Sequence, residues 1–133
     1  MKNGLDRIKL FAIIEKEGLY DFPSFALEIK KQALPEKTSC SAEFLVGSGD
    51  ERDCVLLLEG CRLPFCVRSR QAGDEIETSD GNFKSVNDVF SSWAVPEELR
   101  DFIPLVQEFD EKESGIKCIC GSVCGFKNWI VKK

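Results

Sequence analysis

The chain has 133 residues, of which 43% are hydrophobic and 31% charged, a composition that excludes a disordered or membrane-embedded protein and fits a single domain over residues 1–133. Its 18 Lys and Arg against 23 Asp and Glu give a net charge of −5, so any contact with a polyanion has to come from a local basic patch. Histidine is absent, which removes the usual general base near neutral pH and the commonest nitrogen ligand of metals.

Apolar runs and cysteines indicate the compartment. The longest apolar runs fall far short of the roughly 18 residues of a membrane-spanning helix, and no signal-peptide cleavage pattern follows the first run. The seven cysteines form no C-x-x-C pair and their odd number cannot all pair within one chain, so we expect buried thiols in a reducing cytoplasm, with no membrane partner and no metal. Thiol redox or metal binding by Cys118, Cys120 and Cys124 is the open alternative.

The first half of the chain predicts one helix and then several strands. Apolar residues at near-helical spacing predict a helix over residues 5–17, ended by Gly18. Beyond Pro23, short apolar segments alternate with turns rich in glycine, serine and aspartate. The predicted strands cover residues 25–29, 42–46, 54–59 and 65–70.

The second half predicts a helical insert and two further strands. Val86, Val89, Phe90 and Trp93 occupy one face of a helix over residues 85–93, and Pro96 opens a short helix over residues 97–102. An acidic loop over residues 108–113 precedes strands over residues 116–120 and 126–131, which are joined through Gly121 and Gly125. The order strands, helices, strands predicts an α+β fold with mixed or antiparallel sheets.

The strongest candidate for anion contact is a pair of arginines in the strand over residues 65–70. Arg68 and Arg70 are expected on the same face, about 6.6 Å apart, a spacing close to that of successive phosphates. Guanidinium groups bind phosphate oxygens in a two-pronged manner. Alternatively, the two arginines face solvent or pair with Asp74 and Glu75. Gly73 and Asp74 directly after the strand predict a structural turn.

A second candidate lies on the polar face of the first predicted helix of the insert. Lys84 and Asn87 are one turn apart there, where they reach either a phosphate or solvent. The carboxylates between residues 74 and 80 have no partner base and no spacing typical of metal ligands, so no catalytic site is expected.

Three segments in order resemble the C-terminal domain of tRNA(Ile)-lysidine synthases. They are an Arg-x-Arg-x-x-Gly-Asp strand and turn at residues 68–74, a helix led by Lys84, and a Val-Pro-x-x-x-Arg-Asp-x-x-Pro segment at residues 95–104. The resemblance covers residues 63–121, and residues 1–60 supply the predicted helix and strands that precede it. It implies a β-sandwich of unusual topology with a short helical insert, similar to a domain in the β subunit of phenylalanyl-tRNA synthetase.

The resemblance also implies a function. The family's enzymes are ATP-dependent ligases that join lysine to the wobble cytidine of an isoleucine tRNA, so ATP and lysine are substrates of the parent enzyme. The Ser-Gly-Gly-x-Asp-Ser loop of the family's N-terminal catalytic domain does not occur in this sequence. We therefore expect a non-catalytic C-terminal piece without a cofactor, whose partners are the acceptor stem of tRNA(Ile) and its own catalytic domain.

Carried over residue by residue, the resemblance assigns tRNA binding to five positions. These are Arg68, Arg70, Lys84, Asn87 and Arg100. The helix departs from the family, because Ser85, Asn87 and Asp88 stand where family members commonly carry lysines. Binding is then expected to shift toward the arginines and toward Lys127, Lys132 and Lys133.

The alternative is an interaction domain. In that reading Phe126, Trp129 and Ile130 pack on the catalytic module or on a second copy of the chain in a homodimer.

Overall fold

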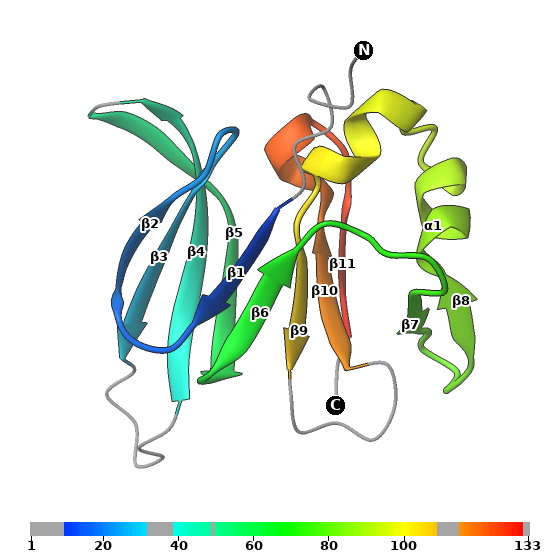
Figure 1. The fold of residues 1–133 in the computed structure, drawn as a ribbon, viewed down its shortest axis with the longest axis horizontal. Helices are drawn as coiled ribbons and strands as arrows, with labels where there is room; N and C mark the ends of the chain where they lie inside the picture. The colour runs from blue at the N-terminus through cyan, green and yellow to red at the C-terminus, as the bar shows by residue number, and fades with distance from the viewer. Residues whose placement is uncertain (1–9, 32–38, 49, 109–114, 132–133) are drawn as a thin grey trace.

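Two antiparallel sheets lie face to face in the computed structural model, which describes residues 10–31, 39–48, 50–108 and 115–131 (Figure 1). The five-stranded sheet has the order β1-β6-β9-β10-β11 and the four-stranded sheet the order β2-β3-β4-β5. The first sheet contains β1 (Phe11–Ile14), β6 (Phe65–Arg68), β9 (Leu105–Glu108), β10 (Ile116–Cys120) and β11 (Asn128–Ile130). The second contains β2 (Gly18–Asp21), β3 (Ala26–Lys31), β4 (Ser39–Ser48) and β5 (Glu51–Arg62).

One apolar core joins the two sheets. Ile14 of β1, Phe65 of β6 and Cys118 of β10 share it with Leu27 of β3 and Phe44 of β4, all of them buried. Alternate residues of a strand point to opposite faces, so each of these strands contributes every second side chain to the core. Removal of this apolar surface from water is the main stabilising contribution to the packing of the two sheets.

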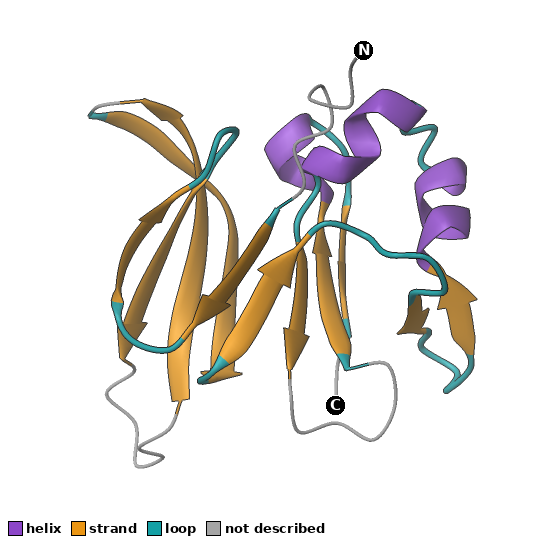
Figure 2. Ribbon diagram, viewed as in Figure 1, coloured by secondary structure: helices purple, strands orange, loops and turns teal. Residues whose placement is uncertain are grey.

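A helical layer covers the other face of the five-stranded sheet (Figure 2). It consists of α1 (Val86–Ser92), the 3-10 helix η2 (Glu97–Phe102) and the small hairpin of β7 (Glu75–Glu77) and β8 (Phe83–Ser85). Val86, Val89 and Phe90 of α1 pack with Leu105 and Ile119 of the sheet in a second core. The five-stranded sheet is therefore the middle layer, buried on both faces along β9 and β10.

Several predicted elements are confirmed. The strands predicted over residues 25–29, 42–46, 54–59 and 116–120 lie within or overlap β3, β4, β5 and β10, and the two helices predicted for the insert are α1 and η2. In α1 the Ser85 hydroxyl accepts a hydrogen bond from the Asp88 backbone amide, as the spacing of the two residues predicts. The mostly antiparallel sheets with few helices agree with an α+β fold.

Other predictions are wrong. Residues 11–14 form the strand β1 rather than part of a helix, because each of them pairs with a residue of β6; residues 1–9 lie outside the described part. Strand β6 ends at Arg68, two residues earlier than predicted, and β11 starts at Asn128 rather than at residue 126. Strands β2, β7, β8 and β9 were not predicted. Of the expected acidic loop, only Glu108 is described, and it ends β9.

No helix in the described part of the chain is long and apolar enough to cross a membrane.

Candidate nucleic-acid interface

The described structure places four of the five predicted tRNA-binding residues in one group at the junction of β6, α1 and η2. Arg68 is the last residue of β6, Arg70 follows it, Asn87 is in the first turn of α1, and Arg100 is in η2. Lys84 lies in β8, three residues before Asn87. Its side chain is half-buried and makes no ion pair with a described residue.

Arg68 is buried in a set of hydrogen bonds. Its Nη1 and Nη2 atoms donate to the two carboxylate oxygens of Asp74 at 2.9 and 3.0 Å, and its Nε donates to Gln107 Oε1 at 2.9 Å. Nη1 also donates to the Ser69 carbonyl at 2.9 Å. The side chain is only 5% exposed, so this guanidinium is directed at protein acceptors rather than at solvent.

The segment between Arg68 and Asp74 is a turn. The Gln71 amide donates to Asp74 Oδ2 at 2.6 Å, and the Asp74 amide donates to the Gln71 carbonyl at 3.2 Å. Gly73 has φ 86°, a left-handed conformation that favours glycine. Gly73 and Asp74 thus occupy a structural turn whose carboxylate also holds the arginine of the strand.

Arg70 connects three elements. Its Nε donates to Asp101 Oδ1 at 3.1 Å, Nη1 to Asn87 Oδ1 at 2.6 Å, and Nη2 to Glu97 Oε2 at 2.5 Å. Burial alone lowers the pKa of Arg70, but the hydrogen bonds and charges of Glu97 and Asp101 outweigh it, so the pKa lies above the ordinary value. The guanidinium stays charged and holds α1 and η2 against the end of β6.

Arg100 of η2 belongs to the same group. Its Nε donates to the Val95 carbonyl at 3.0 Å and its Nη2 to Ser91 Oγ at 3.4 Å, while Nη1 lies 3.9 Å from Glu97 Oε1. The guanidinium carbon lies 5.8 Å from the centre of the Phe90 ring, a cation–π geometry. Glu97 therefore bridges Arg70 and Arg100.

The group is electrically balanced. Arg68, Arg70 and Arg100 contribute three positive charges, and Asp74, Glu97 and Asp101 contribute three negative ones, so the net charge is 3 − 3 = 0. Glu97 is the outermost carboxylate, with a side chain 62% exposed, whereas Asp101 is 8% exposed. A phosphate that approached Arg70 or Arg100 would meet the Glu97 carboxylate first.

Three members of this group were not predicted from the sequence. Asp101, Glu97 and Gln107 hold the arginines, and Ser69 Oγ donates to the Asp101 carbonyl at 2.5 Å. The adjacent Arg100 and Asp101 are a weak signal in the sequence, because nothing local brings them to residues about thirty positions earlier.

Over 68 residues, which make up 51% of this chain, the sequence is 47% identical to the tRNA(Ile)-lysidine synthase of Treponema denticola. The chain is related to tRNA(Ile)-lysidine synthase. The matched segment spans 14% of the length of that relative. No family model and no solved structure matches the chain.

The C-terminal residues that the sequence offers for binding differ in their exposure. Of the C-terminal lysines, Lys127 is exposed between η3 (Gly121–Cys124) and β11, while Lys132 and Lys133 lie outside the described residues. Phe126 and Trp129 are half-buried against the second core, and Ile130 is 40% exposed. Only Ile130 of the three is thus open enough to serve as an apolar contact of its own.

Cysteines lie mostly in the core. Cys40, Cys61, Cys66, Cys118 and Cys120 are buried, Cys54 is exposed and Cys124 is intermediate. Burial raises the pKa of the Cys61 thiol to about 12 and that of Cys120 to about 11, so both stay protonated near neutral pH. In the described part of the chain no three His, Cys, Asp or Glu side chains are grouped to hold a metal ion.

Proposed function

We propose that this chain is a non-catalytic, tRNA-holding domain of the tRNA(Ile)-lysidine synthase type. The observation that carries the proposal is the 47% identity over 68 residues with the tRNA(Ile)-lysidine synthase of Treponema denticola. The sequence adds support, because it has no histidine and lacks the family's nucleotide-binding loop. In this proposal a separate catalytic domain ligates lysine to the wobble cytidine with ATP, in the cytoplasm, while this domain contacts the acceptor stem of tRNA(Ile).

The contact surface follows from the exposure of the charged side chains. Arg68 is too deeply buried to reach RNA, so its role is to position the turn that carries Arg70. Phosphate oxygens bind nitrogens of Arg70 and Arg100 in place of Glu97, whose side chain is 62% exposed. Asn87, which accepts a hydrogen bond from Arg70, and Lys84, three residues before it in the chain, complete the proposed phosphate contacts.

The domain is expected to recognise the double-stranded acceptor stem by its shape. The major groove of A-form RNA is too narrow for side chains, so the domain contacts phosphates and 2′-hydroxyls rather than base edges. In this proposal the two sheets with one shared core and a helical cover are the synthetase-like β-sandwich that the family resemblance implies. Because the net charge is −5, the affinity of the chain alone is expected to be weak and to depend strongly on salt.

A salt titration tests the proposal. The affinity of the chain for a duplex with the tRNA(Ile) acceptor-stem sequence is measured by fluorescence anisotropy at two salt concentrations. If about four phosphates are contacted, the affinity falls roughly a hundredfold between about 50 and 200 mM salt. Lys84→Ala is expected to reduce the affinity, whereas Lys16→Ala, an exposed lysine near β2, is the matched control. Absent or salt-independent binding would contradict the proposal.

A second candidate function is protein interaction, favoured by the edge strand β1. Phe11 is 64% exposed and Ile13 48% exposed, and alternation places both on the same face of this strand. Exposed apolar side chains grouped in this way are typical of a contact surface for another domain or a second copy. Sedimentation equilibrium with Phe11→Ser tests this: concentration-dependent association that the variant abolishes supports it, and a monomer at all concentrations contradicts it.

A further inference from the structure

The strand β11 forms the second edge of the five-stranded sheet, and its outer backbone groups are unpaired in the described structure. Trp129 pairs with Ile119, and the Val131 amide donates to the Lys117 carbonyl at 2.9 Å. In an antiparallel ladder the hydrogen-bonding direction alternates, so Trp129 and Val131 face β10. The amides and carbonyls of Asn128 and Ile130 therefore point away from the sheet, and they make no hydrogen bond with any described residue that would close this edge.

Two hollows flank this edge, one on each face of the sheet. The first has a volume of about 480 Å³ and lies between the sheets, where β5, itself an edge strand, approaches β11. The second, of about 830 Å³, lies between β11 and the tip of the β7–β8 hairpin. Ile130 and Val131 line both. Ile130 pairs with Cys118, so it lies on the face of the sheet that is turned toward the first core. Trp129 pairs with Ile119 and lies on the opposite face, which is turned toward the second core.

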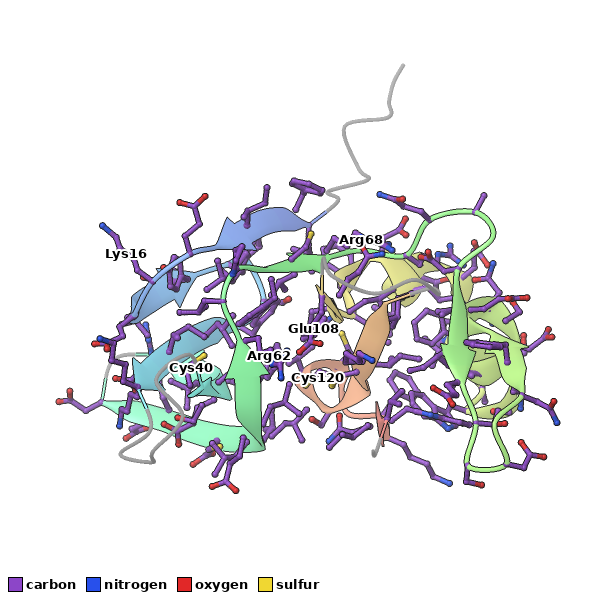
Figure 3. All side chains as sticks on the ribbon, turned by 90° about the horizontal axis from the view of Figure 1, so that it is seen from below. Lys16, Cys40, Arg62, Arg68, Glu108 and Cys120 are labelled. Atoms are coloured by element: carbon purple, nitrogen blue, oxygen red, sulfur yellow. The ribbon has the colours of Figure 1, made fainter. Side chains whose placement is uncertain are left out.

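The hollow between the sheets, called here the inner hollow, has a mixed wall in which apolar side chains stand beside two positive and two negative ones. Its walls include Leu58 of β5, Val106 of β9 and Ile130 of β11. Arg62 and Lys117 are offset by Glu59 and Glu108 among its lining residues. Figure 3 shows the side chains of Arg62 and Glu108 between the two sheets. Because its charges balance, the inner hollow favours an uncharged, apolar side chain that contacts Leu58, Val106 and Ile130 over a charged one.

The hollow beside the hairpin, called here the outer hollow, is acidic. Glu77 and Asp80 line it, and no lysine or arginine does. Trp129 lines it as well, with its Nε1 donating to the Glu77 carbonyl at 3.2 Å, so the indole is fixed at the wall. Two carboxylates and an aromatic face are the partners that a lysine or arginine side chain prefers. The outer hollow therefore suits a basic side chain.

We propose that the edge of β11 binds an extended peptide segment of a partner protein, in which apolar and basic side chains alternate. An added strand lies about 4.8 Å from β11 and hydrogen-bonds to the outward groups of Asn128 and Ile130. Its successive side chains point to opposite faces of the sheet, one into the inner hollow and the next into the outer hollow. Charge complementarity with Glu77 and Asp80 selects the basic positions. This inference does not depend on the proposed tRNA contact.

The test uses a capped peptide of alternating valine and lysine, about eight residues long, with the full chain labelled for NMR. Binding is expected to slow hydrogen exchange of the Asn128 and Ile130 amides, while the exchange of the Trp129 and Val131 amides changes little because they already bond to β10. A peptide of alternating valine and glutamate is the matched control and is expected to bind about tenfold more weakly. Binding without the alternating pattern of protection, or equal binding of the two peptides, overturns the proposal.

Two variants separate backbone pairing from side-chain docking. Ile130→Pro removes the outward amide of an edge strand, a position at which proline is tolerated, and is expected to weaken peptide binding about tenfold. Ile130→Val keeps the amide and is expected to bind as the wild type does. If circular dichroism shows that the proline variant is unfolded, a peptide N-methylated at alternate residues decides instead. Undiminished binding of the N-methylated peptide in both registers would falsify strand addition.

Discussion

Arg68 and Asp74 form a two-pronged ion pair across the turn that follows β6. Their four atoms lie in two parallel contacts of 2.9 and 3.0 Å, and the side chains are only 5% and 12% exposed. Such a pair at low exposure contributes little net stability relative to a well-packed apolar pair, but the loss of one partner leaves a buried charge uncompensated. The turn and the direction of Arg70 therefore depend on Asp74.

Asp74→Asn is expected to lower the free energy of unfolding by about 3 kcal/mol, because the Arg68 guanidinium keeps its burial and loses the opposite charge. Urea unfolding followed by circular dichroism measures the change. The control is Glu75→Gln, an exposed neighbour whose replacement is expected to change stability by less than about 0.5 kcal/mol. If both variants unfold at the same urea concentration, Arg68 does not need the carboxylate.

Glu97 competes with phosphate for Arg70 and Arg100 if the proposed tRNA contact is correct. Glu97→Gln is then expected to strengthen binding of the acceptor-stem duplex by about five- to tenfold at low salt, which corresponds to roughly 1 kcal/mol. Fluorescence anisotropy measures the affinity. Glu98→Gln, on the same 3-10 helix and also exposed, changes the net charge equally and serves as the control.

The comparison of these two glutamate variants decides between a local and a global effect. An equal increase for both would indicate only the reduced net negative charge of the chain. No increase for Glu97→Gln would show that Arg70 and Arg100 serve the fold alone.

Local patterns predicted the elements whose residues depend on near neighbours. Val86, Val89 and Phe90 share one helical face, and Ser85 caps α1 as its spacing predicts. Similarly, Leu27 and Ile29 alternate along β3 and are buried in the first core. The spacing of apolar residues and the capping residues belong to a short segment, so both can be recognised from the sequence alone.

Contacts between residues that are distant in the sequence determine the elements that were predicted wrongly. Phe11 and Ala12 have helical spacing with their neighbours, but they pair with Arg68 and Val67 of β6, and this pairing outweighs local preference. The strand containing Arg68 was expected to continue to Arg70, and the turn held by Asp74 ends it instead. The pairing of an arginine with Asp74 was an open alternative from the sequence, and the structure contains it.

Gly121 begins the 3-10 helix η3 at a point where two backbone segments meet. A Cβ atom there would lie 2.2 Å from the Lys127 carbonyl oxygen and 3.2 Å from the Trp93 ring, so the backbone must move. Gly121→Ala is expected to destabilise the chain by about 2 to 3 kcal/mol in urea unfolding. Gly125→Ala, with φ 86° and open space around the position, tests strain without a clash and is expected to cost about 1 kcal/mol. The reverse order of the two effects would contradict the close approach.

Buried thiols make the stability of the chain fall at alkaline pH. Burial, with smaller contributions from Cys40 and Glu108, raises the pKa of the Cys61 thiol from 9.0 to about 12. Below pH 9.0 the thiol is protonated whether the chain is folded or not, so its contribution to stability is fully present. Between pH 9.0 and about 12 only the unfolded chain releases the proton, and the free energy of unfolding falls by about 1.4 kcal/mol per pH unit for this thiol. Urea unfolding of the wild type and of Cys61→Ala across this range measures the difference: the slope is expected to be shallower in the variant by that amount, and identical slopes would mean that Cys61 ionises equally in both states.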